Sequence, residues 1–243
     1  MGKNTIMPAN TVMITDQSES LRLQTWLSPA FPVGGYSFSH GLETAIEKGL
    51  LDDRYSLIDW LEADISHGTG HVEVIFLAAA WRAVTEQNAD ALVEAADFAA
   101  ALRATSEFSL ESGTQGTAFL STVMKVWPSE VLVKAVNLLR ASDITPVLPI
   151  AVGIACAAER ISLEQTAPQY LQAWSANLIN AAVRAIPLGQ TDGQHIVAAL
   201  ETRIAECASK AVNCSLDDVG SATLMIDVMS MHHETQYTRI FRS

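Results

Sequence analysis

The sequence is poor in charged residues, and those it has are mostly acidic. Charged side chains make up 17% of the 243 residues, and 15 Lys and Arg against 27 Asp and Glu give a net charge of −12. Such a chain repels phosphate backbones, and it has no basic cluster to offset this, so we expect no nucleic-acid binding. The 49% hydrophobic content and the mean hydropathy of +0.20 exclude a disordered chain. They also indicate an oligomer or a complex.

The sequence has only three cysteines, its apolar runs are short, and its first residues do not form a leader pattern. Cys156, Cys207 and Cys214 are odd in number and show no CxxC spacing, which predicts thiols in a reducing compartment rather than a disulfide framework. The apolar runs 74–81 and 146–158 are too short to cross a bilayer. The first residues lack the basic-then-apolar pattern of a signal peptide. We therefore expect a cytoplasmic protein without a membrane segment.

Glycine and proline number only 13 and 8, and Ala- and Leu-rich stretches lie between them. Apolar residues recur at helical spacing, as in Leu171, Trp174 and Leu178, and no stretch alternates as a strand would. The sequence therefore predicts an all-α fold, a single-domain bundle of about ten helices. Pro168 predicts a kink. The helices are predicted over 18–27, 37–49, 56–67, 71–87, 90–105, 106–126, 129–141, 147–160, 163–186, 191–212 and 216–234.

The expected organisation has three parts: a flexible N-terminal segment over 1–16, a helical domain over 17–234, and a C-terminal tail over 235–243. The tail combines aromatic residues with two arginines, the residue types enriched in binding hot spots. Termini usually fray, and aromatics on a frayed end gain nothing. We therefore expect the tail to order on a partner rather than on its own domain.

The segment 28–43 is the most unusual stretch of the chain. Two prolines keep its first half extended, and Gly34-Gly35 permits a turn with positive φ before the next helix. A turn of this kind can hold an anion, but neither GxxxxGK[ST] nor GxGxxG is present, so no nucleotide site is predicted. Two interpretations stay open: an interhelical loop that packs its own aromatics, or a loop that docks a partner.

The histidines offer only weak metal-site patterns. His67 and His71 are four residues apart with Glu73 nearby, but the glycines between them interrupt the helix that this spacing requires. A helix end followed by a turn is the favoured interpretation. His232, His233 and Glu234 are adjacent, so their side chains diverge. We predict no metal site and no cofactor, and keep a metal-dependent helical enzyme that uses these residues as the alternative.

Nucleophilic catalysis finds no support either. The chain has no G-x-S-x-G elbow, and Cys156 lies in an apolar run where its thiol stays protonated and inert. We therefore predict no catalytic residues.

Gly113 and Gly116 lie inside a helical run, where they indicate either a close helix crossing or the approach of a partner backbone.

The segments 28–43, 184–194 and 233–243 together resemble the UreF family of urease accessory proteins, in order and over nearly the whole chain. Of the family pattern at 111–116, this chain keeps Gln115-Gly116. The resemblance implies an all-α, dimeric, non-enzymatic protein. It would bind the accessory protein UreD (also called UreH) and recruit the GTPase UreG, so that the assembly delivers nickel to apo-urease and the scaffold modulates the GTPase.

The resemblance also implies docking roles for particular residues. The candidate partner-binding residues are Phe31, Pro32, Gly34, Tyr36, His40, Gln115, Tyr237, Arg239, Phe241 and Arg242.

A helical GTPase regulator that acts outside urease maturation remains a further alternative function.

Overall fold

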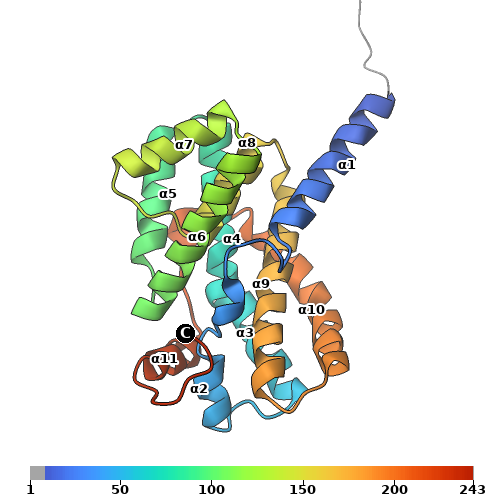
Figure 1. Ribbon diagram of the computed structural model, residues 1–243, viewed down its shortest axis with the longest axis vertical. Helices are drawn as coiled ribbons and strands as arrows, with labels where there is room; N and C mark the ends of the chain where they lie inside the picture. Colours follow the sequence, from blue (N-terminus) through green and yellow to red (C-terminus); the bar gives the residue numbers. More distant parts are fainter. Residues whose placement is uncertain (1–8, 243) are drawn as a thin grey trace, which may run out of the picture.

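The computed structural model describes residues 9–242, with side chains from residue 17 on. Its described part is helical and contains no β-strand, which confirms the predicted all-α bundle (Figure 1). The α-helices are α1 (Ala9–Trp26), α2 (Leu42–Glu47), α3 (Arg54–His67), α4 (Thr69–Thr85), α5 (Ala89–Ala101), α6 (Ser106–Val126), α7 (Glu130–Ala141), α8 (Leu148–Ala158), α9 (Leu163–Ala185), α10 (Gln190–Ala211) and α11 (Leu224–His233). Two 3-10 turns, η1 (Gly35–Ser37) and η2 (Leu216–Asp218), lie between them.

Helices α4 and α8 form the centre of the bundle. Every residue of α8 from Pro149 to Cys156 is buried, as expected for a helix that is apolar on all sides. The two helices can approach closely because Gly153 has no side chain: a Cβ there would clash with the carbonyl oxygen of Leu77. Helices α3, α5, α9 and α10 pack around α4, and α6 covers α8. Burial raises the pKa of the Cys156 thiol to about 12, so the thiol stays protonated, as the apolar run predicts.

Several helix starts differ from the predicted ones. Helix α3 begins at Arg54, two residues before the predicted start, because the carboxylate of its N-cap Asp53 accepts from the backbone N–H groups of Tyr55 and Ser56. Helix α1 begins at Ala9, inside the segment predicted to be flexible, since a helix that has formed extends at little further cost. Residues 1–8 of that segment lie outside the described residues. Helix α9 continues through Pro168 as one element.

Two predicted helices are interrupted. The helix expected over 37–49 shortens to α2, because His40 and Gly41 both adopt left-handed backbone conformations with φ of 53° and 75°. The helix expected over 216–234 is replaced by η2, an extended crossing and α11. In that crossing, the N–H of Ala222 donates to the carbonyl oxygen of His67 over 2.7 Å.

Gly116, one of the two glycines of α6, lies where another part of the chain approaches closely. A Cβ on Gly116 would lie 2.2 Å from the carbonyl oxygen of Pro146, so the connection between α7 and α8 needs this position bare. The close approach is therefore internal to the chain.

The two ends of the described chain lie far apart. Helix α1 projects from one end of the body, and α11 with the tail folds back beside α2 at the other end (Figure 1). Within residues 9–242, no helix combines the length and the apolar character needed to span a membrane.

Candidate docking surface and the cavity behind it

Arg184, near the end of α9, joins the three segments that the sequence singled out. Its Nη2 donates to the carbonyl oxygen of Tyr36 over 2.7 Å, and its guanidinium lies 4.6 Å from the centre of the Phe241 ring. The backbone N–H of Arg242 donates to the carbonyl oxygen of Ser37 over 2.7 Å. The loop after α1, the end of α9 and the tail thus form one continuous surface, which we call the docking surface.

A buried carboxylate anchors the tail to this surface. Glu43 of α2 accepts from the N–H of Ile240 over 2.6 Å, from the N–H of Phe241 over 2.9 Å, and from Nε2 of His233 over 3.1 Å. The other ring nitrogen of His233 lies 2.7 Å from Oε2 of Glu107. Each ring nitrogen of His233 thus faces a carboxylate.

Arg239 completes the anchoring from the tail side. Its Nη1 donates to Glu107 over 2.7 Å, and its Nε and Nη2 donate to the carbonyl oxygens of Gln236 and Glu234. The sequence predicts a tail that orders on a partner. In the structure the tail lies against its own domain, because the Glu43 carboxylate and the Arg184 guanidinium supply contacts that the tail's own sequence does not reveal.

The predicted partner-binding residues fall into two groups. Tyr36 is 71% exposed and Tyr237 fully exposed, and Pro32 and Arg242 are exposed as well. Gly34 adopts the left-handed conformation expected of it, with φ of 77°. The others make contacts within the domain: Phe31 and Phe241 are buried, Arg239 is ion-paired, and His40 and Gln115 line a cavity. Glu43 and His233 could not be recognised as anchors from the sequence, because no local pattern shows which polar side chains become buried.

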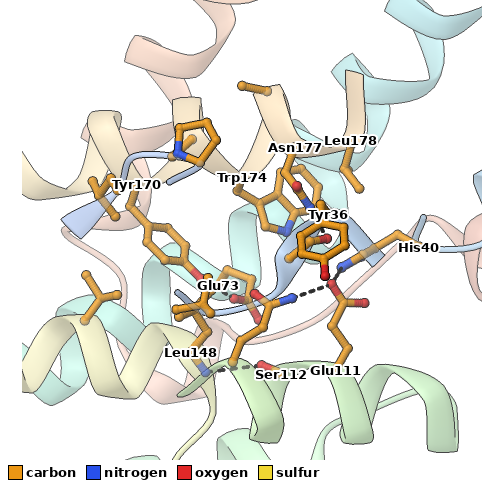
Figure 2. A pocket seen from close by; sticks show the side chains of 18 of the residues that line it. Tyr36, His40, Glu73, Glu111, Ser112, Leu148, Tyr170, Trp174, Asn177 and Leu178 are labelled. Carbon is orange, nitrogen blue, oxygen red and sulfur yellow. Dashed lines mark hydrogen bonds and ion pairs between the residues drawn. The ribbon is translucent and has the colours of Figure 1, made fainter. Parts of the chain in front are cut away.

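The cavity lies behind the docking surface and has a volume of about 250 Å³. Its walls come from α4, α6, α8, α9 and the loop after α1. Figure 2 shows His40 and Glu111 next to each other in its lining, joined by a dashed line, with Nε2 of His40 3.0 Å from Oε1 of Glu111. The same carboxylate oxygen accepts from Nε2 of Gln115 over 2.9 Å.

A second polar cluster forms another wall. Arg103 donates to Oε1 of Glu73 over 2.6 Å, and the hydroxyl of Tyr170 donates to Oε2 over 2.5 Å. Burial, together with the adjacent Glu73 carboxylate, raises the pKa of Tyr170 well above its ordinary value, so the phenol stays protonated. Both carboxylate oxygens of Glu73 therefore have donors.

The electrostatics around His40 are those of a buried ion pair. Burial opposes the charged imidazole, but the charge of Glu111 and the hydrogen bond to it act more strongly together, and the pKa of His40 is raised. Burial also raises the pKa of the nearby Asp64 to about 6, although His40 and the backbone N–H of Thr69 act in the opposite direction. The cavity lining thus brings together several ionisable side chains: His40, Glu73, Arg103, Glu111 and Tyr170.

The structure does not bring the weak metal pattern together. His71 and Glu73 are two residues apart on α4 and point to nearly opposite sides of it, and Glu73 is bound by Arg103 and Tyr170. Glu234 instead accepts from the backbone and the hydroxyl of Ser106. Among the described side chains, no group of three or more His, Cys, Asp and Glu is placed to hold a metal ion.

Comparison with known proteins agrees with the resemblance found in the sequence. The profile of the UreF family matches residues 51–201. The urease accessory protein UreF of Rhodopseudomonas palustris (strain HaA2) is 45% identical over 240 residues, which cover 98% of this chain and all of that protein. The chain belongs to the UreF family. The UreF proteins of Bradyrhizobium diazoefficiens and Granulibacter bethesdensis are 41% and 42% identical over 244 and 229 residues.

Membership of the UreF family makes this chain a urease accessory protein. The match to the first of these relatives extends over nearly the full length of both chains, so UreF relatives share the region of the docking surface and its tail.

Proposed function

We propose that this protein is a non-enzymatic scaffold of urease maturation in the cytoplasm. It binds a UreD/UreH-type accessory protein, recruits the GTPase UreG and modulates its activity, and works as a homodimer. The resulting assembly delivers nickel to apo-urease. The observation that carries the proposal is the docking surface, in which three distant segments meet around Arg184.

The docking surface is suited to binding because its exposed aromatics stand on an anchored backbone. Tyr36 is held through its own carbonyl oxygen by Arg184, and the tail that carries Tyr237 and Ile240 is anchored by Glu43. Ile240 is 69% exposed, and both tyrosines are more exposed still. Because the backbone is already ordered, a partner that covers these side chains loses little conformational entropy.

Helix α11 extends the apolar character of this region. Leu224, Met225 and Met231 are 71%, 54% and 48% exposed, and α11 packs beside α2 next to the tail. Exposed apolar side chains in such number support a protein that works within a complex.

A single substitution tests the proposal. Tyr237 is fully exposed, so Tyr237→Ala should leave the fold unchanged and weaken binding to a UreD–UreG complex by about 1–3 kcal/mol, the range of a hot-spot residue. The matched control is Val131→Ala, which also truncates an exposed apolar side chain, on α7 at the opposite end of the body from the tail (Figure 1).

Binding is measured by co-purification and titration with the partners, in the presence of GTP or GDP. Loss of affinity for Tyr237→Ala alone supports the proposal. Equal affinities for wild type and both variants contradict the docking role of the tail, and turnover of a substrate by the purified chain contradicts a scaffold without catalysis.

A further inference from the structure

Three buried nitrogen atoms lack hydrogen-bond partners, and the residues that carry them surround one cavity. In the described part of the chain, the buried side-chain polar atoms without a partner are Nε1 of Trp26, Nδ1 of His40 and Nη2 of Arg103. All three residues line the 250 Å³ cavity. Native proteins leave few buried polar atoms unpaired, so three around one cavity point to a ligand that pairs with them.

The unpaired atoms are donors. The indole N–H of Trp26 and the Nη2 of Arg103 can only donate. The Nε2 of His40 faces Glu111, and in the charged ring that this carboxylate favours, Nδ1 also carries a proton. The ring centre of His40 lies 4.8 Å from that of Phe108 and 5.7 Å from that of Trp174, so aromatic rings hold it in place.

The neighbouring acceptors already have donors of their own. Oε1 and Oε2 of Glu73 accept from Arg103 and Tyr170, and Oε1 of Glu111 pairs with His40 and Gln115. Several water molecules also fit a cavity of this volume and could pair with one another as well as with the three donors. A carboxylate or carbonate oxygen differs from water because it carries negative charge, which strengthens the hydrogen bond that it accepts from each donor.

We propose that this cavity binds a small oxyanion of the carboxylate or carbonate type, which accepts hydrogen bonds from Trp26, His40 and Arg103. A volume of 250 Å³ accommodates an ion of this size. The exposed side chains of Tyr36 and Arg184 belong to the same lining, so the cavity reaches the surface beside a guanidinium that attracts anions.

The affinity is expected to be weak. Arg103 and His40 are each paired with a carboxylate, so the ligand meets donors in a region of nearly balanced charge. We expect a dissociation constant of about 1 mM, which corresponds to a small ligand held by a few hydrogen bonds.

The indole N–H signals of the full-length protein provide the test. The chain has five tryptophans, so a ¹H–¹⁵N spectrum of the indole region is simple to assign. Sodium acetate and sodium bicarbonate are titrated separately, with sodium chloride at matched ionic strength and with acetamide as a neutral molecule of the same shape as acetate. The expected result is a saturable downfield shift of the Trp26 indole with acetate or bicarbonate. Trp81, whose Nε1 already donates to the carbonyl oxygen of Ile161 over 2.9 Å, should not respond.

A variant identifies the donors. Arg103→Lys keeps the charge beside Glu73 and removes the guanidinium fork, so the affinity should fall roughly tenfold. Arg203→Lys, on the exposed side of α10, is the control and should bind as wild type does. If Arg103→Lys does not fold, the comparison of acetate with acetamide on the wild-type protein decides the question.

Three results would overturn the proposal. These are the absence of a saturable Trp26 shift with either anion, an equal shift with acetamide, and an unchanged affinity in a folded Arg103→Lys protein. The first would mean that the cavity holds water alone, and the second that it recognises a carbonyl group and not a negative charge.

Discussion

Replacing Glu43 by glutamine removes the anchor of the tail while keeping the shape of the side chain. In the wild-type protein, Oε1 of Glu43 accepts from Ile240 N–H, and Oε2 accepts from Phe241 N–H and His233 Nε2. An amide accepts at only one of these two positions and presents an NH₂ group at the other. At least one buried N–H therefore loses its acceptor, and the imidazole of His233 loses a charged partner.

The expected loss follows from burial. The side chain of Glu43 is 8% exposed and that of His233 fully buried, so solvent cannot replace the missing interaction. An unsatisfied buried donor costs about 1–3 kcal/mol, and more where the acceptor that it loses is a charged group. We expect the tail to lose about 3 kcal/mol of docking free energy, enough to raise its open population roughly a hundredfold.

Amide hydrogen exchange measures this change directly. The N–H groups of Ile240 and Phe241 should be protected in the wild-type protein and exchange roughly a hundredfold faster in Glu43→Gln, while α4 and α8 stay protected. Glu47→Gln, an exposed position on the same helix, is the matched control and should change neither amide. Unchanged protection of both amides in Glu43→Gln would refute the anchoring role.

Three further predictions concern the core and the docking surface. The carboxyl of Asp64 has a folded pKa of about 6 against an ordinary 3.8, so its ionisation costs the wild-type protein about 3 kcal/mol of stability. The free energy of unfolding of Asp64→Asn, relative to wild type, should therefore rise with pH between about 4 and 6. Denaturation at pH 4 and pH 7 checks this, and a difference between the two proteins that is independent of pH contradicts it. Gly116→Ala should lose about 3 kcal/mol of stability or fail to fold, because its Cβ would meet a backbone carbonyl oxygen. Gly113→Ala is the control: its Cβ would lie 3.3 Å from a methyl group, so its stability should change by less than about 1 kcal/mol in the same denaturation experiment. Arg184→Met should weaken tail docking by about 1 kcal/mol through loss of the cation–π contact with Phe241, seen as faster exchange of the Phe241 amide; equal exchange rates would contradict this.

The helices could be predicted from the sequence because their signals are local. The spacing of Leu171 and Leu178 on one face of α9 and the Ser162 cap at its start are visible within a few residues of chain. The interruption at His40 and Gly41 was not visible, since a non-glycine residue with positive φ is held there by packing around the cavity. The predicted start of α3 lies two residues too late, because local pattern does not show that the Asp53 side chain folds back onto the N–H groups of Tyr55 and Ser56.

The candidate site also has features that the sequence predicts and features that only the tertiary structure shows. Composition and motif order indicate an acidic, helical protein with a UreF-like loop and tail, because these properties depend on which residues follow one another. The pairing of Glu43 with the tail, of His40 with Glu111, and of Arg103 with Glu73 joins residues that are 30 to nearly 200 positions apart. Such pairs form only when helices pack, since burial raises the strength of an ion pair and the penalty for an unpaired donor, and no stretch of sequence encodes which helix faces will meet.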